Sequence, residues 1–225
     1  MRTIIRLMFS FFGYNVYFVK RKQTEDAIRL CSRDFEDMEW ANKKIAKRFD
    51  SKQNIIFYKS ILSIINKEEI DLNHKKVCDM GCGNGSFINI IRTYYDPACI
   101  IGMDFSKEAI KIAQDRELNN VTFNTHDIYV PSEEKFDIIF CTEVLEHLEH
   151  PEIAVKNILD TLEPSGIAIM TVPNGRLDYY TGHINFWSIF SWNIFLKKTI
   201  NTSFIDIKTG ILDKQNSHLY AILKR

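Results

Sequence analysis

A short segment rich in carboxylates and imidazoles contains the residue types best suited to acid–base or metal chemistry. It reads CTEVLEHLEHP and contains Glu143, Glu146, His147, Glu149 and His150. Glu143, Glu146 and His147 stand at i, i+3 and i+4, so in a helical turn they share one face. Carboxylates with an imidazole can ligate a divalent ion, and an imidazole can also transfer a proton near neutral pH.

His183 adds an imidazole from a distant segment, TVPNGRLDYYTGHINFWS, which follows a strand expected over 166–172. Both segments are expected at the carboxyl edge of one sheet, where ligands bind in α/β folds. Three roles stay open at this point. Glu143, Glu146, His147 and His183 form the ligand set of one ion, or His147 or His183 is a base without metal, or the side chains are structural.

A glycine loop in VCDMGCGNGSF joins a predicted strand to a predicted helix. Gly81, Gly83 and Gly85 let the backbone turn tightly and approach a ligand closely. The loop is one residue shorter than the dinucleotide form, which disfavours a nicotinamide cofactor. Asp79 precedes it, and its charge would repel a diphosphate but suits a ligand with an ammonium group.

Two further acids follow the next two predicted strands. Asp104, within IIGMDFS, stands at the carboxyl end of the second predicted strand, 25 residues after Asp79. This is near the offset of an acid that accepts from ribose hydroxyls. Asp127 follows the third strand in HDI, where it suits an adenine amino group with Ile128 against the ring. One such acid is often a helix cap, but three at successive strand ends favour a nucleoside-binding edge.

The elements that must position these residues alternate in type after residue 73. Strands are predicted over 76–80, 99–104, 121–125, 136–141, 166–172, 203–209 and 217–224, and helices over 85–94, 106–117, 151–162 and 188–198, after a helical region over 24–66. This alternation predicts a doubly wound α/β fold with a parallel sheet.

Five motifs in this order, VCDMGCGNGSF, IIGMDFS, HDI, FDIIFCTEVLEHL and LEPSGIAIMTVPN, resemble class I S-adenosylmethionine-dependent methyltransferases. The resemblance covers about residues 50–225. It implies a Rossmann-like, seven-stranded sheet with a reversed final hairpin. The expected organisation is a basic aromatic arm over 1–22, a helical lid over 23–72 and an S-adenosylmethionine-binding domain over 73–225.

The resemblance also implies which residues hold the cofactor, whose product is S-adenosylhomocysteine. The glycine loop holds the methionine part, the second acid the ribose, and the residues after the fourth strand face the methionine end. The implied set is Asp79, Met80, Gly81, Cys82, Gly83, Asn84, Gly85, Asp104, Phe105, Asp127, Ile128, Thr142 and Glu143. Trp40 and Tyr58 are expected contacts from the lid.

The Glu-x-x-Glu-His pattern resembles the metal site of small-RNA 2′-O-methyltransferases and occurs similarly in ubiquinone-pathway O-methyltransferases. The resemblance implies a divalent metal held by Glu143, Glu146, His147 and His183, which would bind neighbouring acceptor hydroxyls. In the wider family Glu-His-Leu also occurs here without metal.

Composition limits the partners. Lys+Arg and Asp+Glu are both 29, so the chain lacks the basic excess of a nucleic-acid binder, and no nucleic acid is expected. Five cysteines are too few for a disulfide scaffold, so a cytoplasmic location with reduced thiols is expected. Cys78, Cys82 and Cys141 are expected to pack in the strands and loop.

The arm over 1–22 carries five basic residues and no acid around the aromatic run LMFSFFGYNVYFV. The run is too short to span a membrane, and no cleavage site follows it. It packs on the domain or on a second subunit of a homodimer, or it is a peripheral anchor at the inner face of the membrane.

The lead expectation is a methyltransferase acting on a hydroxyl of a small molecule, a sugar or surface-glycan precursor, because the layout resembles bacterial methyltransferases of those pathways. Quinone or lipid O-methylation, N-methylation and a non-catalytic cofactor-binding module are the alternatives. Trp187 and Tyr179 or Tyr180 belong to the core or line an acceptor pocket.

Overall fold

The computed structural model describes residues 32–180, 182–200 and 205–225. The arm predicted over 1–22 lies outside these residues, as does the first part of the helical region.

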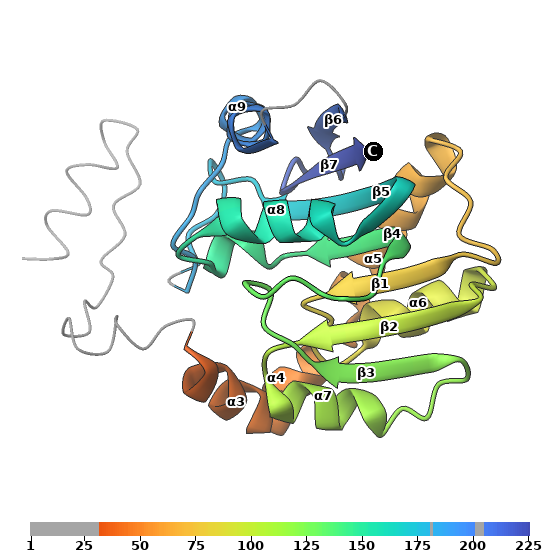
Figure 1. Cartoon of the computed structure of the whole chain (residues 1–225). Helices are drawn as coiled ribbons and strands as arrows, with labels where there is room; N and C mark the ends of the chain where they lie inside the picture. The colour runs from red at the N-terminus through yellow and green to blue at the C-terminus, as the bar shows by residue number, and fades with distance from the viewer. Residues whose placement is uncertain (1–31, 181, 201–204) are drawn as a thin grey trace, which may run out of the picture. The chain divides into compact units, whose positions relative to one another are not determined.

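A seven-stranded sheet forms the centre of the described domain (Figure 1). Its strands are β1 (Lys76–Met80), β2 (Cys99–Asp104), β3 (Val121–Thr125), β4 (Phe136–Thr142), β5 (Leu162–Pro173), β6 (Asp206–Ile211) and β7 (His218–Lys224). Their order is β3-β2-β1-β4-β5-β7-β6, and β7 runs antiparallel to both of its neighbours. This confirms the predicted α/β fold with a reversed final hairpin.

Helices cover both faces of the sheet. They are α3 (Arg33–Ala41), α4 (Lys43–Arg48), α5 (Lys52–Lys67), α6 (Ser86–Tyr94), α7 (Lys107–Gln114), α8 (Pro151–Asp160) and α9 (Ile189–Ile200), with a 3₁₀ turn η1 (Leu145–His147). Among the described residues, no helix combines the length and apolarity needed to cross a membrane.

The core has two layers because successive strand residues face opposite sides. In β1, Cys78 joins the cluster that contains α8 and α9, whereas Val77 joins the cluster that contains α5 and α6. Both faces of the central strands are buried, which is why these strands read as continuous apolar runs. Helix α5, expected as part of the lid, thus packs into the core of the domain.

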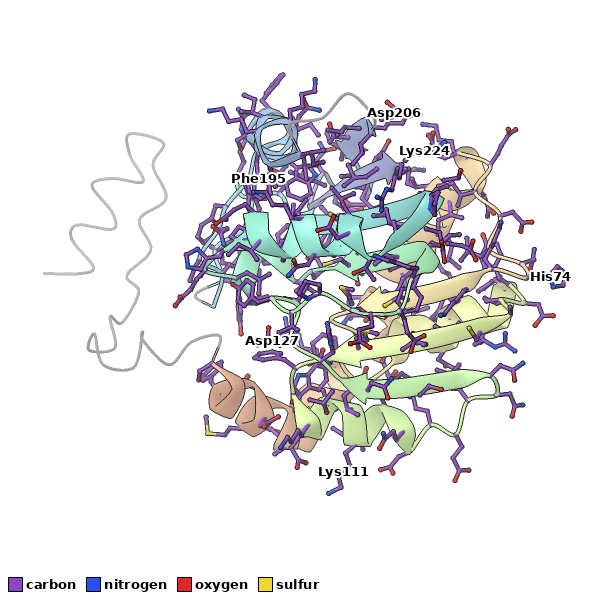
Figure 2. The ribbon with its side chains drawn as sticks, viewed as in Figure 1. His74, Lys111, Asp127, Phe195, Asp206 and Lys224 are labelled. Atoms are coloured by element: carbon purple, nitrogen blue, oxygen red, sulfur yellow. The ribbon has the colours of Figure 1, made fainter. Side chains whose placement is uncertain are left out.

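The sheet order places the predicted motifs at one edge. The chain crosses from β3 to the far side of β1, so the direction of winding reverses between β1 and β4, and the crevice at their carboxyl ends is the expected ligand site. Asp127 lies at this carboxyl edge, and His74 and Lys224 lie at the opposite edge (Figure 2). Because β7 is antiparallel, its first residue, His218, pairs with Pro173 at the end of β5 and also reaches the carboxyl edge.

Candidate active site

The glycine loop adopts a conformation that L side chains rarely accept. Gly81, Gly83 and Gly85 have φ values of +81°, +52° and +74°. A Cβ on Gly81 would collide with Val144, which follows β4, and one on Gly83 would lie 2.9 Å from the Trp40 ring. The glycines therefore let the β1 edge of the crevice lie directly against the β4 edge and the lid.

Asp79 and Asp104 are buried carboxyl groups beside this loop, with exposed fractions of 1% and 8%. Asp104 accepts hydrogen bonds from the backbone N–H groups of Gly83 and Ser106, both at 2.9 Å. Burial raises the pKa of Asp104 to about 6, against these hydrogen bonds. Burial and the neighbouring Asp104 raise the pKa of Asp79 to about 8, and Asp79 Oδ1 has no hydrogen-bond partner among the described residues. A buried carboxyl group in this state suits a cationic ligand.

The residues expected to contact adenine lie after β2 and β3. Phe105 and Ile128 are half-buried, and Ile128 packs against the core cluster of α8. Asp127 Oδ1 accepts from the Tyr129 backbone N–H at 3.0 Å. His126 was not predicted as a site residue. Its Nε2 is buried without a hydrogen-bond partner among the described residues.

Two residues were expected to contact the ligand from the lid, Trp40 and Tyr58. Trp40 lies against the glycine loop, whereas Tyr58 is a core residue of α5. Trp40 stacks on Phe49 with ring centroids 4.7 Å apart and lies against Gly83. Tyr58, on α5, stacks on Phe87 in the core. Burial, followed by the charge of Asp79, raises the pKa of the Tyr58 hydroxyl.

Helices α3 and α4 are tied to the cofactor edge by polar contacts. Asp37 on α3 accepts from Ser106 Oγ, which caps α7. Asn84 in the glycine loop donates to the Ala46 carbonyl at 3.0 Å. The described part of the lid therefore lies over the end of β2 as well as the loop.

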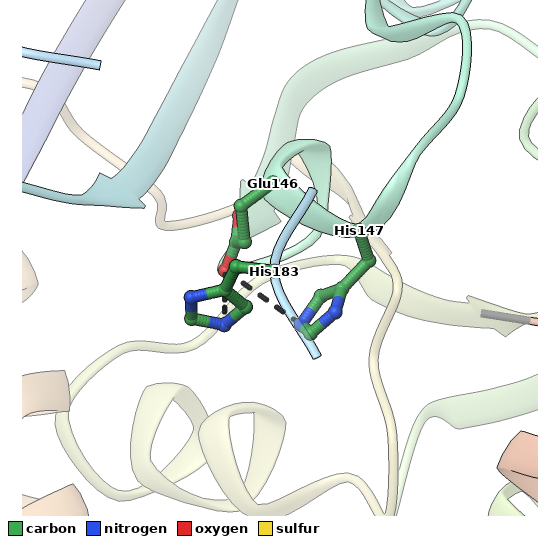
Figure 3. A group of neighbouring side chains, drawn as sticks. All are labelled: Glu146, His147 and His183. Carbon is green, nitrogen blue, oxygen red and sulfur yellow. Dashed lines mark ion pairs between the residues drawn. The ribbon is translucent and has the colours of Figure 1, made fainter. Parts of the chain in front are cut away.

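The segment after β4 is not one helical turn. Glu143 has φ +55° and precedes the 3₁₀ turn η1, so the expectation that it shares a face with Glu146 and His147 is wrong. The left-handed backbone at Glu143 turns its side chain out of that row. Glu146 and His147 do converge with His183, and their ligand atoms lie within 4.8 Å of one another (Figure 3).

The buried carboxyl group of Glu146 is at the centre of this group. Its Oε1 lies 3.9 Å from His147 Nε2 and 3.9 Å from His183 Nε2. It is 1% exposed, and neither oxygen has a hydrogen-bond partner among the described residues. Burial, and then the charge of Glu143, raises the pKa of Glu146 well above its usual range.

Both histidines are anchored through Nδ1. His147 Nδ1 lies 3.2 Å from the Gly182 carbonyl oxygen and His183 Nδ1 lies 2.5 Å from Asp178 Oδ2. With Nδ1–H as donor in each contact, Nε2 of each ring faces Glu146. Burial, and then His183, lowers the pKa of His147 to about 4, so this ring is neutral at neutral pH.

Backbone contacts explain why such distant segments meet. The N–H groups of Ile184 and Asn185 donate to the Glu146 carbonyl at 2.9 and 3.0 Å. Asn185 Nδ2 also donates to the Leu148 carbonyl at 2.6 Å. The loop after β5 is thereby fixed against η1.

Glu146, His147 and His183 fit a divalent ion. An orphaned carboxylate with two imidazole Nε2 atoms is a suitable donor set, and the Asp178–His183 contact is the usual support behind a metal-ligating histidine. Tetrahedral ligands bonded at about 2.1 Å stand about 3.4 Å apart, so the three donors, which lie within 4.8 Å of one another, must move closer together to bind an ion. Glu143, predicted as a fourth ligand, is not in this group and instead lies beside Thr171 and His218.

Large apolar side chains are exposed around the His183 loop and on α9. They are Leu177, Tyr179, Tyr180, Ile184, Phe186, Phe190 and Ile194, with Tyr179 93% and Phe190 72% exposed. We call this set the apolar rim. Trp187 is 8% exposed and packs against Trp192 and Phe195, so it belongs to the core. Cys78, Cys82 and Cys141 are buried, as expected for packing residues.

The chain matches known methyltransferases in sequence. Residues 51–199 match the family described as "Methyltransferase domain". The chain is similar to "Ubiquinone biosynthesis O-methyltransferase" of Coxiella burnetii, at 29% identity over 119 residues, which cover 51% of this chain and 50% of that protein. The protein of the same name from Glaesserella parasuis is 31% identical over 129 residues, which cover 53% of this chain and 54% of that protein. The chain thus spans about half the length of the curated relatives it matches.

Solved structures share its fold. An N-methyltransferase NodS from Bradyrhizobium japonicum, in complex with S-adenosylhomocysteine, superposes with a TM-score of 0.67 at 17% identity, covering 86% of this chain and 97% of that chain. A methyltransferase in complex with the Trm112 activator of Haloferax volcanii gives 0.70 at 12% identity, covering 84% and 96%. Fold and edge together define a class I S-adenosylmethionine-dependent methyltransferase. The chain belongs to the methyltransferase family that its residues 51–199 match.

Proposed function

We propose that this chain binds S-adenosylmethionine between the ends of β1 and β4 and transfers its methyl group to a hydroxyl of an apolar acceptor. The observation that carries the hydroxyl assignment is the buried Glu146 carboxyl group between two Nδ1-anchored histidines at the same edge. Asp79 and the glycine loop hold the methionine end, and Asp104 takes the ribose hydroxyls.

The reaction is a displacement at the methyl carbon. The oxygen–carbon bond forms, the sulfur–carbon bond breaks with its electron pair left on sulfur, and the hydroxyl proton passes to a histidine Nε2 or to water. The chain contributes mainly alignment and exclusion of water, because the cofactor carries the leaving group. Its buried carboxyl groups orient the cationic end of the cofactor toward the acceptor.

Glu146, His147 and His183 are the residues that would hold a divalent ion. Such an ion supplies Lewis acidity, which lowers the pKa of a bound hydroxyl. His147 or His183 is the alternative base without metal. The His147 ring is neutral at neutral pH, but its pKa of about 4 makes it a weaker proton acceptor than an ordinary imidazole. Removal of the ion distinguishes the two roles.

The apolar rim supports an acceptor with an apolar part, such as a quinone or lipid. Two of its members, Tyr180 and Phe186, contact the His183 ring, with centroids 4.8 and 6.5 Å away. The names of the curated relatives refer to ubiquinone. The rim also supports peripheral contact with a membrane, in which exposed aromatic side chains enter the headgroup region. The sugar or glycan acceptor predicted from the sequence stays a prediction, as does a homodimer.

The test uses methyl-labelled S-adenosylmethionine, an extract of the source cells, and separation of the products into organic and aqueous phases. Label in the organic phase that depends on an added divalent ion supports the proposal. Label in the aqueous phase favours a sugar acceptor. A labelled methyl group bound to nitrogen in the product favours N-methylation. Bound cofactor without labelled product favours a binding module.

A matched pair of variants locates the chemistry. Glu146→Gln should lose turnover by about 10²-fold or more while S-adenosylhomocysteine binding is kept. Glu149→Gln is the control, because Glu149 lies in the same segment but is exposed. Equal turnover in both variants would remove Glu146 from the site.

A further inference from the structure

A second cluster of polar side chains lies at the same edge. It contains His218 and Asp213 from the final hairpin and Glu143 from the segment after β4. We propose that His218 is a positioning residue that fixes the Glu143 carboxylate at the junction of the cofactor and acceptor sites. This inference deepens the proposed methyl transfer and rests on it for its kinetic readout.

His218 is itself held in one orientation. Its Nδ1 lies 3.0 Å from Asp213 Oδ2, and its backbone N–H donates to the same oxygen at 2.9 Å. Ser217 donates to Asp213 through its N–H and its hydroxyl, at 3.1 and 3.0 Å. The ring also packs on Phe57 of α5, with centroids 4.6 Å apart.

These donors keep Asp213 ionised. Burial opposes its charge, but the hydrogen bonds from Ser217 and His218 outweigh burial and lower the pKa of Asp213. An ionised carboxylate at Nδ1 requires the proton on that nitrogen, which directs Nε2 toward Glu143. The same logic of a carboxylate that orients an imidazole operates in hydrolase triads.

Glu143 is the group on which His218 acts. Its Oε2 lies 3.6 Å from His218 Nε2, an ion-pair distance at which the contact is attractive when a proton lies between the two atoms. Its Oε1 accepts from Thr171 Oγ1 at 2.9 Å. Its backbone, at φ +55°, donates to the Thr171 carbonyl at 3.1 Å. Both carboxylate oxygens are therefore directed to β5 and β7, and Glu143 stays outside the group of Glu146, His147 and His183.

Glu143 adjoins both halves of the site along the chain. The next residue, Val144, lies against Gly81 of the glycine loop, and Glu146 follows three residues later in η1. Glu143 therefore lies in the short segment that joins the glycine-loop contact to the group of Glu146, His147 and His183. A carboxylate that rotates there changes the alignment of donor and acceptor, and small misplacements cost large factors in rate.

Two substitutions separate the two ring nitrogens of His218. The amide of His218→Asn reaches the position of Nδ1, so it keeps the contact with Asp213 and loses the one with Glu143. The amide of His218→Gln reaches the position of Nε2 and can restore the contact with Glu143. His150→Asn is the matched control, because His150 has a 60% exposed side chain.

The experiment measures turnover with labelled S-adenosylmethionine and the organic extract, binding of S-adenosylhomocysteine by calorimetry, and crystal structures with that product bound. We expect His218→Asn to lower kcat about tenfold, with the product dissociation constant changed less than about threefold. We expect His218→Gln to recover most of kcat and the control to match the parent protein.

A kcat unchanged in His218→Asn, or reduced equally in both His218 variants, would overturn the proposal. If the parent protein transfers no methyl group, the proposed function fails, and the crystal structures decide the inference alone. Glu143 displaced in the Asn variant and returned in the Gln variant supports it, whereas an unmoved Glu143 refutes it.

Discussion

Single carboxyl groups set the chemistry of this edge. Asp79, Asp104 and Glu146 are each buried, and burial is the largest cause of the raised pKa of each. Burying an ionised carboxyl group costs stability unless a ligand or another partner compensates for its charge. Binding of a cationic ligand should therefore change the protonation of these groups.

Cofactor binding should depend on pH through Asp79. Its carboxyl group is protonated in the free protein below about pH 8, and the cofactor's ammonium group favours the ionised form. Binding at pH 7 should therefore release a proton, and affinity should rise with pH by up to about tenfold per unit until about pH 8. Calorimetry of S-adenosylhomocysteine in buffers of different ionisation enthalpy measures this release. If Asp79→Asn still releases a proton on binding, the proton comes from a group other than Asp79.

Asp104 should contribute directly to cofactor affinity. Asp104→Ala removes the proposed acceptor for two ribose hydroxyls and should weaken S-adenosylhomocysteine binding by about 1–3 kcal/mol. Calorimetry at fixed pH checks the change, with thermal unfolding as the control for folding. Unchanged affinity in a folded variant would place Asp104 outside the site.

At the level of elements, we expect α3 and α4 to be the covering that opens. They contact the rest of the domain through a small apolar cluster with Ala109 of α7, through Trp40 at Gly83 and through polar contacts, whereas α5 is part of the large core. Elements with few buried contacts open locally before the domain unfolds. Access to the cofactor edge is expected to follow this opening.

Trp40→Ala should loosen α3 and α4 without unfolding the sheet. Loss of the stack on Phe49 and of the contact with the glycine loop should speed amide exchange in 33–48 by at least about tenfold and leave β1 and β4 unchanged. Hydrogen exchange by mass spectrometry measures both regions. Met38→Ala is the control on the same helix, because Met38 is 63% exposed. Uniform acceleration across the domain would assign Trp40 to the core instead.

At the level of the whole domain, the apolar rim exposes seven large apolar side chains, each by at least 46%, on the His183 loop and α9. Exposed apolar side chains that gather into a patch generally mark an interaction site. Lys197 and Lys198 stand in the last turn of α9, which also carries Phe190 and Ile194 of the rim. Basic and apolar side chains on one element suit an anionic lipid surface.

A double substitution on α9 tests this contact. Phe190→Ser with Ile194→Ser should reduce partition onto vesicles of anionic phospholipid by at least about tenfold, because each buried apolar side chain contributes about 1.5–3 kcal/mol. Vesicle sedimentation measures the bound fraction. Tyr94→Ser, a 54% exposed position on α6, is the control. Equal partition of both variants would remove the rim from membrane contact.

The local pattern of the sequence predicts most strands and helices and the edge of the sheet at which the acids lie. The strands predicted over 76–80, 99–104 and 121–125 match β1, β2 and β3. β1 and β2 are buried apolar runs, whereas β3 is mostly exposed and is marked by its β-branched and aromatic residues. Fifth-strand and hairpin bounds differ: β5 begins at Leu162 rather than 166, and β6 ends at Ile211 rather than 209. Parallel strands bring their carboxyl ends together, so the acids after them were predictable as one site.

The tertiary structure alone decided how the side chains divide into groups. The left-handed backbone at Glu143 turns its side chain away from Glu146 and His147. No local sequence pattern predicts that conformation in a non-glycine residue. His218 reaches the same edge only because β7 runs antiparallel between β5 and β6. Spacing reports neighbours along one helix or strand, whereas contacts between residues 143 and 218 depend on strand order, which packing of the whole sheet sets.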